Sequence, residues 1–259
     1  AGRLTRWHKS FTSAEKLEDV IQQIVGRHNR VVNQSTPIVD TRLADGSRVN
    51  VVLYPVALNG PVVTIRKFPK EQITMDRLVE LEALSEEVAG VLKKLVVSGY
   101  NIFISGGTGS GKTTLLNALS QYIPKEERLI TIEDNAELQI LDVPNLVRLE
   151  ARNANVEGIG EITIRELIRS ALRMRPNRII VGEVRGPETI DMLQAMSTGH
   201  KGSLSTGHSD SPKDMLRRLE TMVLMGMDVP LAAIQRQIAS AIDIIIHIGR
   251  LWDKSRKLL

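Results

Sequence analysis

Hydrophobic and polar residues follow two different spacings along the chain, and the change between them divides it in two. Before residue 30 the apolar residues recur at helical spacing and predict an amphipathic helix; they are Leu17, Val20, Ile21 and Ile24. From Ile38 onward, short β-prone runs are separated by turn residues, and Asp45-Gly46 is a tight hairpin signal. One helix and a small antiparallel sheet predict a compact α+β unit that ends near residue 70, with a linker from Pro69 to about Asp76.

From Leu78 onward, stretches with helical spacing alternate with short apolar runs that are typical of buried strands. The expected helices cover residues 78–97, as one or two helices, then 115–120, 163–174 and 187–196, and two more begin near 211 and 230. The expected strands cover residues 101–105, 128–132, 147–149, 178–182, 202–206 and 243–248. Strands that alternate with helices predict a mostly parallel sheet covered on both faces. We therefore expect a smaller α+β domain with its linker over residues 1–75 and a larger α/β domain over 76–259.

A glycine-rich segment joins the first strand of the larger domain to the helix that follows it. It matches the phosphate-binding pattern G-x-x-x-x-G-K-[ST] and consists of Gly106, Gly107, Thr108, Gly109, Ser110, Gly111, Lys112, Thr113 and Thr114. Glycines let backbone N–H groups surround an anion, and the helix N-terminus adds its positive dipole end. We expect Lys112 to reach the β- and γ-phosphates of ATP and the Thr113 hydroxyl to bind Mg²⁺. The segment predicts a nucleotide-binding protein rather than a simple glycine-rich turn.

Three more of the expected strands end in residues that can do chemistry: Glu133-Asp134, Glu183 and His208. In parallel sheets, ligands bind outside the carboxyl ends of the strands, so we expect these residues to converge on the phosphate loop. Glu183 suits Mg²⁺ held directly or through water, and Glu133 suits a base that orients the attacking water; the two roles could be exchanged. For Asp134 we expect a supporting role.

Two histidines, His200 and His208, bracket one expected strand beside this site. A lone histidine is more often a structural hydrogen-bonding group than a catalytic one. A pair beside a phosphate site is equally consistent with sensing of the bound phosphate.

Arg165, Arg169 and Arg173 are spaced to line one face of a helix, and Arg175 follows just beyond. Such a row is usually a solvated basic stripe. The alternative is that one of these arginines reaches the nucleotide of a neighbouring subunit in a ring.

The composition is that of a globular protein, with 42% hydrophobic and 25% charged residues among 259. Cysteine is absent, which excludes disulfides and thiol catalysis. Neither a signal-peptide core nor an apolar run long enough to span a bilayer is present, so we expect a cytoplasmic protein. The net charge of +4 is only mildly basic and aromatic residues make up 3%, so base-stacking platforms are scarce and we expect no nucleic acid partner.

The motifs resemble those of the secretion and pilus-assembly ATPases of the type II/type IV secretion superfamily, and most closely the CpaF/TadA branch that powers tight-adherence pili. The segments that carry this resemblance are 106–120, 132–138, 172–185 and 193–208, with Arg48 and 65–68 in the smaller domain. The resemblance covers roughly residues 35–255. The family usually has a longer N-terminal region, so we expect this chain to be a fragment.

The resemblance implies a RecA-like C-terminal domain, ATP with Mg²⁺ as ligands, and a homohexameric ring that drives an inner-membrane platform protein. It places Glu133 and Asp134 in an acidic motif, makes Glu183 the Walker B glutamate, and assigns His200 and His208 to a histidine motif. Arginines of the N-terminal domain approach the phosphates in this family, so Arg48 and Arg66 become candidates. The resemblance also implies a place at the inner membrane as a peripheral protein.

Three other functions remain open at this point. The nearest is a type IV secretion or archaellum-type motor of the same superfamily. A RecA-like DNA translocase is more distant, because of the low aromatic content. The third is a docking module that binds ATP with little turnover; Lys112, Thr113, Glu133 and Glu183 together argue against it.

Overall fold

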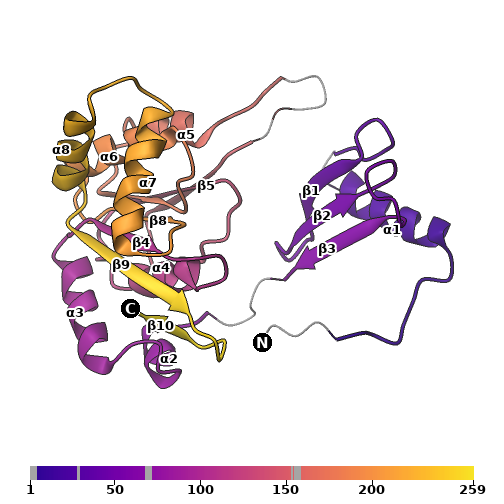
Figure 1. The fold of residues 1–259 in the computed structure, drawn as a ribbon, viewed down its shortest axis with the longest axis horizontal. Coiled ribbons are helices and arrows are strands. Elements are labelled where there is room, and N and C mark those ends of the chain that lie inside the picture. Colours follow the sequence, from indigo (N-terminus) through magenta and orange to yellow (C-terminus); the bar gives the residue numbers. More distant parts are fainter. Residues whose placement is uncertain (1–4, 28–29, 68–71, 153, 155–158) are drawn as a thin grey trace. The chain divides into compact units, whose positions relative to one another are not determined.

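The computed structural model describes residues 5–27, 30–67, 72–152, 154 and 159–259. The chain folds as two compact units, Ala1–Glu71 and Gln72–Leu259. Figure 1 shows the elements of both units. Of the sequence predictions, Phe68 and Pro69, at the end of the smaller unit, lie outside the described residues. No helix in the described ranges is long and apolar enough to cross a bilayer.

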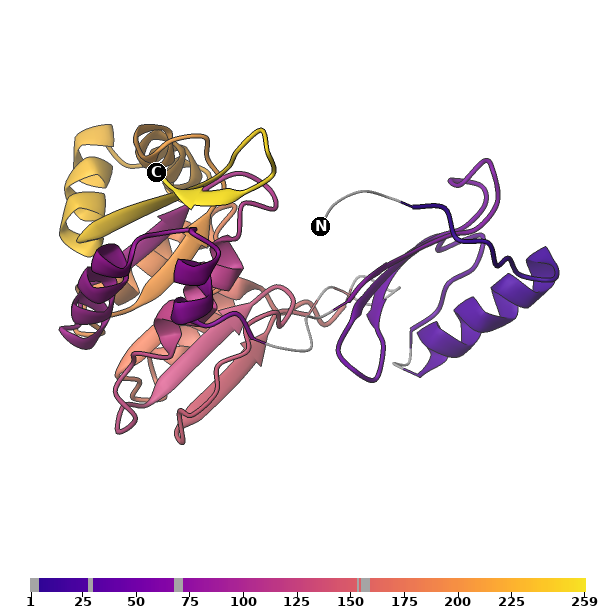
Figure 2. The same ribbon diagram turned by 90° about the horizontal axis from the view of Figure 1, so that it is seen from below.

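The smaller unit is one helix packed on one face of a three-stranded antiparallel sheet, as Figure 2 shows. Its elements are α1 (Ala14–Gly26), β1 (Ile38–Arg42), β2 (Arg48–Val52) and β3 (Val62–Arg66). The expected hairpin joins β1 to β2, and Gly46 there has the positive φ of 83° that favours glycine. Alternate residues of β2, Val49 and Val51, are buried with Ile21 and Val25 of α1. This two-residue periodicity turns alternate side chains of β2 toward α1, as expected for a sheet with one face covered by a helix.

The larger unit is a seven-stranded sheet with helices on both faces. Its strands are β4 (Ile102–Ser105), β5 (Leu129–Glu133), β6 (Leu146–Glu150), β7 (Arg178–Val181), β8 (Leu204–Gly207), β9 (Ile244–Arg250) and β10 (Arg256–Leu258), in the order β10-β9-β4-β8-β7-β5-β6. Only the β9–β10 pair is antiparallel among the pairings described. The central strands β4, β5, β7 and β8 are buried along their whole length, which explains their continuous apolar sequences.

The two faces of this sheet carry different helices and separate apolar cores. One core contains residues of α2 (Met75–Glu80), α3 (Glu86–Val97) and α4 (Lys112–Ser120). The other contains residues of α5 (Ile164–Ala171), α6 (Glu188–Ser197), α7 (Pro212–Leu224) and α8 (Leu231–Ala241). The predicted α/β fold, with a mostly parallel sheet covered on both faces, is confirmed.

Several boundaries differ from the sequence predictions for local reasons. The stretch over 78–97, expected to form one or two helices, lies in two, because Thr74 and Ser85 each accept a backbone hydrogen bond as an N-cap. Helix α2 therefore begins at Met75, inside the stretch that we expected to be linker. The capping box at Thr163 and Glu166 is present, but α5 ends at Ala171, before the expected residue 174.

Candidate functional site

The phosphate loop connects the buried strand β4 to α4 at the carboxyl edge of the sheet. Gly111 is the N-cap of α4 and has a φ of 106°, which a residue with a side chain rarely adopts. No side chain caps this helix, so its first backbone N–H groups are not occupied by a capping residue. A helix N-terminus of this kind, preceded by a glycine-rich loop, is a site for phosphate groups.

Lys112 lies with its side chain at the mouth of this loop and is only 6% exposed. Its ammonium group donates to the carbonyl oxygens of Gly106 and Gly107, at 2.9 and 3.0 Å. It also lies 3.1 Å from Nδ1 of His208. Burial lowers the pKa of Lys112, and the nearby carboxylate of Glu183 opposes that effect. The loop therefore holds a buried positive charge beside its helix N-terminus.

His208 links this lysine to Glu183. Its Nε2 lies 2.8 Å from Oε1 of Glu183, while Nδ1 faces the Lys112 ammonium group. Because an ammonium group can only donate, Nδ1 accepts and the ring proton is on Nε2. Burial lowers the pKa of His208, against the effect of Glu183, and Lys112 lowers it further. His208 is thus neutral at pH 7 and acts as a hydrogen-bond bridge.

Glu183 follows β7 by two residues and has both carboxylate oxygens engaged. Arg185 donates to Oε1 from Nε at 3.0 Å and to Oε2 from an Nη atom at 3.1 Å. This hydrogen bonding raises the pKa of Arg185, and Asp134 adds to the rise as a nearby negative charge. Sequence reasoning gave Arg185 no role, although this residue ends the motif segment 172–185. The supporting role expected for Asp134 remains a proposal.

Glu133, at the end of β5, is only 4% exposed. Its Oε1 accepts hydrogen bonds of 2.8 Å from the backbone N–H groups of Glu137 and Leu138. Its Oε2 is buried and has no hydrogen-bond partner among the described residues. Burial raises the pKa of Glu133 to about 7, although the two backbone N–H groups oppose the rise. A carboxyl group that titrates near neutral pH and has one unpaired oxygen is suited to proton transfer.

Gly182 makes room for this carboxyl group. A Cβ atom at Gly182 would lie 2.9 Å from Cγ of Glu133, closer than such atoms approach in folded proteins. The glycine before Glu183 therefore allows the side chain of Glu133 to cross the neighbouring strand β7. The structure brings the carboxylates of β5 and β7 to the same edge of the sheet as the phosphate loop.

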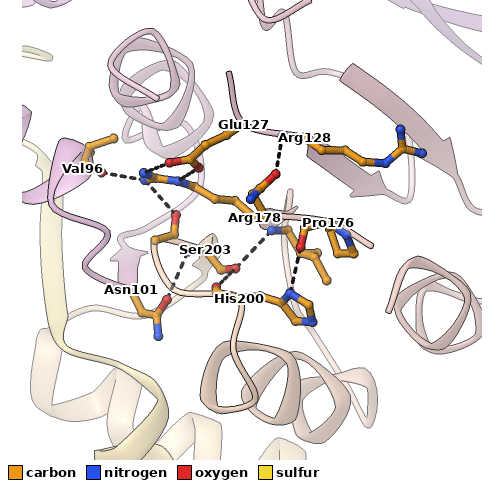
Figure 3. A network of polar contacts seen from close by, with 11 residues as sticks. Val96, Asn101, Glu127, Arg128, Pro176, Arg178, His200 and Ser203 are labelled. Carbon is orange, nitrogen blue, oxygen red and sulfur yellow. Dashed lines mark hydrogen bonds and ion pairs between the residues drawn. The ribbon is translucent and has the colours of Figure 1, made fainter. Parts of the chain in front are cut away.

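The two predicted histidines lie at opposite ends of β8. His208 follows the strand, whereas His200 precedes it, and Nδ1 of His200 lies 3.1 Å from the carbonyl oxygen of Pro176. Figure 3 shows His200 in a network at the amino edge of the sheet, with Arg178, Ser203 and Asn101. Within this chain, the structure does not bring His200 to the phosphate loop, because the length of β8 separates them.

The arginines of α5 are held by an acidic residue of α6. Arg165 and Arg169 donate to the two carboxylate oxygens of Asp191 at 2.7 and 3.0 Å, and the side chain of Asp191 is only 6% exposed. Because α5 ends at Ala171, Arg173 lies beyond the helix and the expected row of three arginines is wrong. The ion pairs join α5 to α6. This structural role differs from both sequence hypotheses, the solvated basic stripe and the contact with a neighbouring subunit.

Arg48 and Arg66 lie opposite each other in the sheet of the smaller unit. Arg42, which sequence reasoning did not single out, is opposite Arg48 on the other side. The three arginines thus form one row across β1, β2 and β3. The phosphate contacts expected of Arg48 and Arg66 remain a proposal.

A buried histidine, His247, completes the carboxyl edge and was also missed. It lies in β9, is 6% exposed, and its Nδ1 is 2.9 Å from Oγ of Ser105, the residue before the phosphate loop. Burial lowers its pKa; Asp210 opposes this and Lys112 adds to it. The continuous apolar pattern of its strand had hidden this residue.

The site fits a magnesium nucleotide as its ligand. The described residues contain no group of three or more His, Cys, Asp or Glu side chains that could hold a metal ion alone. Thr113 in the first turn of α4 and Glu183 just beyond β7 would be the protein's oxygen donors to Mg²⁺, and a nucleotide would supply the rest. The buried charge of Lys112 and the unpaired oxygen of Glu133 are consistent with this ligand.

Comparison with known proteins gives one consistent result. Residues 5–257 match the family model described as type II/IV secretion system protein. A putative conjugal transfer protein of Mycobacterium tuberculosis is 36% identical over 261 residues, which cover 98% of this chain and 74% of that protein. The type IV secretion system protein VirB11 of Brucella abortus is 36% identical over 244 residues, which cover 84% of this chain and 67% of that protein.

Two solved structures agree with this result. The VirB11 ATPase of the Brucella suis type IV secretion system, in complex with sulphate, has a TM-score of 0.60 and 31% identity over 95% of this chain and 82% of that one. The ATPase DotB of Legionella pneumophila has a TM-score of 0.66 over 100% of this chain and 71% of that one, and its 23% identity shows the fold alone. The larger unit therefore has the expected RecA-like fold. The chain belongs to the type II/IV secretion system protein family.

Proposed function

We propose that this chain is an ATP-hydrolysing motor subunit of a pilus-assembly or protein-secretion machine. The observation that carries the proposal is the convergence of Lys112, His208 and Glu183 in one hydrogen-bonded chain beside the phosphate loop. Glu133, with its raised pKa, lies at the neighbouring strand end. The names of the related proteins, which include secretion ATPases, support the same activity.

In this proposal each residue has a separate task. The N–H groups of residues 106–114 and the Lys112 ammonium group bind the phosphates of ATP. Thr113 and Glu183 hold Mg²⁺, directly or through water, and the ion neutralises charge that develops on the phosphates. Glu133 accepts the proton of the attacking water through its unpaired Oε2, because its pKa of about 7 leaves the carboxylate form available at neutral pH.

His208 reports whether the phosphates are bound. Lys112 cannot keep its contacts with two loop carbonyls and with Nδ1 of His208 while it binds a phosphate. When Lys112 turns to the phosphate, Nδ1 loses its donor and the contact between His208 and Glu183 is free to rearrange. The same step releases Glu183 from part of its present hydrogen bonding.

We infer further that subunits work as a homohexameric ring at the cytoplasmic side of the inner membrane, where they move a platform protein. Arg48 and Arg66 are the candidates for phosphate contacts from the smaller domain. His200 is a candidate only across a subunit boundary, since its own loop is at the other end of β8. The domains in this proposal are those predicted from the sequence, 1–75 and 76–259.

Two machines are compatible with this activity. The tight-adherence pilus, powered by the CpaF/TadA branch, is the one that the sequence motifs favour. A type IV secretion motor is favoured by the names of related proteins, among them a putative conjugal transfer protein and VirB11. A docking module with little turnover is disfavoured, because binding alone does not require a buried, unpaired carboxyl oxygen at Glu133.

The test is the rate of ATP hydrolysis as a function of protein concentration, measured for the wild type, Lys112→Ala and Glu183→Gln. A ring motor predicts a specific activity that rises as subunits assemble and that is lost in both variants. A rate per subunit that stays constant with concentration would contradict the ring. ATP binding without turnover by the wild type would point to the docking module.

A further inference from the structure

The β9–β10 hairpin packs against the phosphate loop along one side. The carbonyl oxygen of Ile248 in β9 lies too close to the position that a Cβ atom of Gly106 would take, and the Cδ1 atom of Ile248 lies 3.5 Å from the Cβ position of Gly111. Both ends of the loop are thus fitted to the same strand. This explains why two loop positions tolerate only glycine, independently of any bound phosphate.

One side chain of β10, Arg256, contacts the loop itself. Its Nε donates to the carbonyl oxygen of Gly109 at 2.9 Å. Its Cδ atom lies 3.3 Å from the Cβ position of Gly111. The rest of the guanidinium group has no hydrogen bond or ion pair to any described residue, and the side chain is exposed.

The strand β10 and the residue after it are held in place by further hydrogen bonds. The N–H group of Leu258 donates to the carbonyl oxygen of Ala83 at 2.8 Å, and the Lys257 ammonium group donates to that of Glu82 at 2.6 Å. The N–H group of Leu259 donates to the carbonyl oxygen of His247 at 2.9 Å. Arg256 therefore reaches the loop from a fixed strand.

The chemistry of the loop explains what this contact does. A phosphate group needs N–H donors around it and is repelled by carbonyl oxygens. Lys112 occupies the carbonyl oxygens of Gly106 and Gly107, and Arg256 occupies that of Gly109. The hydrogen bond to Gly109 also polarises the peptide group that carries the N–H of Ser110, and so strengthens that N–H as a donor.

We propose that Arg256 is a positioning residue of the phosphate loop, which holds the Gly109 carbonyl away from the nucleotide and adds positive charge beside its phosphates. The proposal rests on the nucleotide site proposed above and assigns to it a residue of the C-terminal hairpin. Arg256 acts on affinity for the nucleotide phosphates and not on the proton transfer at Glu133. Its loss should therefore raise KM and leave kcat nearly unchanged.

The experiment compares Arg256→Ala and Arg256→Lys with a matched control, Arg250→Ala. Arg250 is opposite Arg256 in the β9–β10 ladder, is also exposed, and makes no side-chain hydrogen bond to the loop among the described residues. Binding of fluorescent mant-ADP is measured by titration at low and high salt, alongside KM and kcat for ATP. Thermal unfolding of each variant shows whether it is folded.

We expect Arg256→Ala to weaken mant-ADP binding by roughly tenfold, which corresponds to about 1.4 kcal/mol. Arg256→Lys should recover part of the loss because it keeps the charge, and Arg250→Ala should bind as the wild type does. The difference between wild type and Arg256→Ala should shrink at high salt.

Equal binding by folded Arg256→Ala and wild type would overturn the proposal, and so would an equal loss in Arg250→Ala. If Arg256→Ala does not fold, mant-ADP binding by Arg256→Lys is compared with that by Arg250→Ala. Weaker binding by Arg256→Lys supports the proposal, and equal binding by the two variants overturns it. A wild-type protein that binds no nucleotide would overturn the proposed function as well. Nucleotide binding that Lys112→Ala abolishes, but Arg256→Ala leaves intact, would overturn this inference alone.

Discussion

The two edges of the large sheet handle their charged groups in opposite ways. At the amino edge, the buried guanidinium of Arg178 makes two hydrogen bonds to Glu127 and others to the carbonyl oxygens of Val96 and Gly202 (Figure 3). At the carboxyl edge, Lys112 depends on loop carbonyls and a neutral histidine, and Glu133 leaves one oxygen unpaired. The charged group at the amino edge has its hydrogen-bond partners within the protein, whereas those at the carboxyl edge have partners that a ligand can replace.

This difference separates structural from functional polar groups. Asn101 at the amino edge donates to the carbonyl oxygens of Met196 and Ala241 and accepts from the N–H of Ser203. Such a network fixes the starts of several strands and needs no ligand. At the carboxyl edge, buried groups with raised or lowered pKa values are kept at a cost in stability, which is typical of active sites.

The largest effect expected is on turnover, from Lys112→Ala. Removal of the ammonium group should lower kcat/KM for ATP by about 10²–10³-fold, because no other described cation contacts the loop carbonyls at Gly106 and Gly107. The free energy of unfolding, measured by urea denaturation, should change much less than this loss of activity. A variant with Lys213→Ala, an exposed lysine in the first turn of α7, is the control and should keep full activity.

At the amino edge, Arg178→Met should affect stability instead. It leaves the carboxylate of Glu127 without its main partner and should reduce the free energy of unfolding by about 2–4 kcal/mol, measured by urea denaturation. Arg173→Ala, at an exposed arginine nearby, should change it by less than about 0.5 kcal/mol. Equal stability of Arg178→Met and the wild type would contradict the role assigned to the amino edge.

Glu133→Gln sharpens the comparison through pH. The wild-type kcat should fall as pH drops through about 7, because protonation removes the base. The folded-state pKa is above the unfolded value, so Glu133 favours the fold at low pH and this contribution is lost as pH rises through 7. The variant should therefore gain stability relative to wild type between pH 5 and 8, by about 1–3 kcal/mol in urea denaturation at each pH. A pH-independent difference would show that Glu133 is not buried as described.

The smallest effect is expected from the two histidines, taken as a pair. His200→Ala should cost about 0.5–1.5 kcal/mol of stability, because it loses one hydrogen bond to Pro176. His208→Ala should leave stability nearly unchanged and reduce turnover. Both variants are tested for turnover and for stability by urea denaturation. Loss of the isolated subunit's activity in His200→Ala, together with full activity in His208→Ala, would contradict the comparison.

The elements at the carboxyl edge could be predicted from the sequence because their residues follow local rules. A glycine-rich loop, a strand end and a capping box each have a recognisable pattern within a few residues, as at Gly111, Glu133 and Thr163. Residues that act through distant contacts had no such pattern. Arg256 and Gly109 are 147 positions apart, and His247 and Ser105 are 142 apart, so only the folded chain brings them together.

The polar network at the amino edge could not be predicted from the sequence for the same reason. Arg178 opens an apolar strand and was counted as part of it, although its side chain is fully buried and joins β7 to the turn at Gly202 and the end of α3. His200 was placed at the phosphate site because it lies near His208 in sequence. The length of the intervening strand, and not the spacing in sequence, decides which edge a residue reaches.

Hydrogen exchange with and without a non-hydrolysable ATP analogue tests the comparison most directly. We predict that the analogue protects backbone N–H groups in residues 106–114 and in the segments that follow β5, β7 and β8. The N–H groups of Ile179 and Ser203, which are already hydrogen-bonded at the amino edge, should exchange at the same rate in both samples. Protection at the amino edge with no change in the phosphate loop would contradict the account.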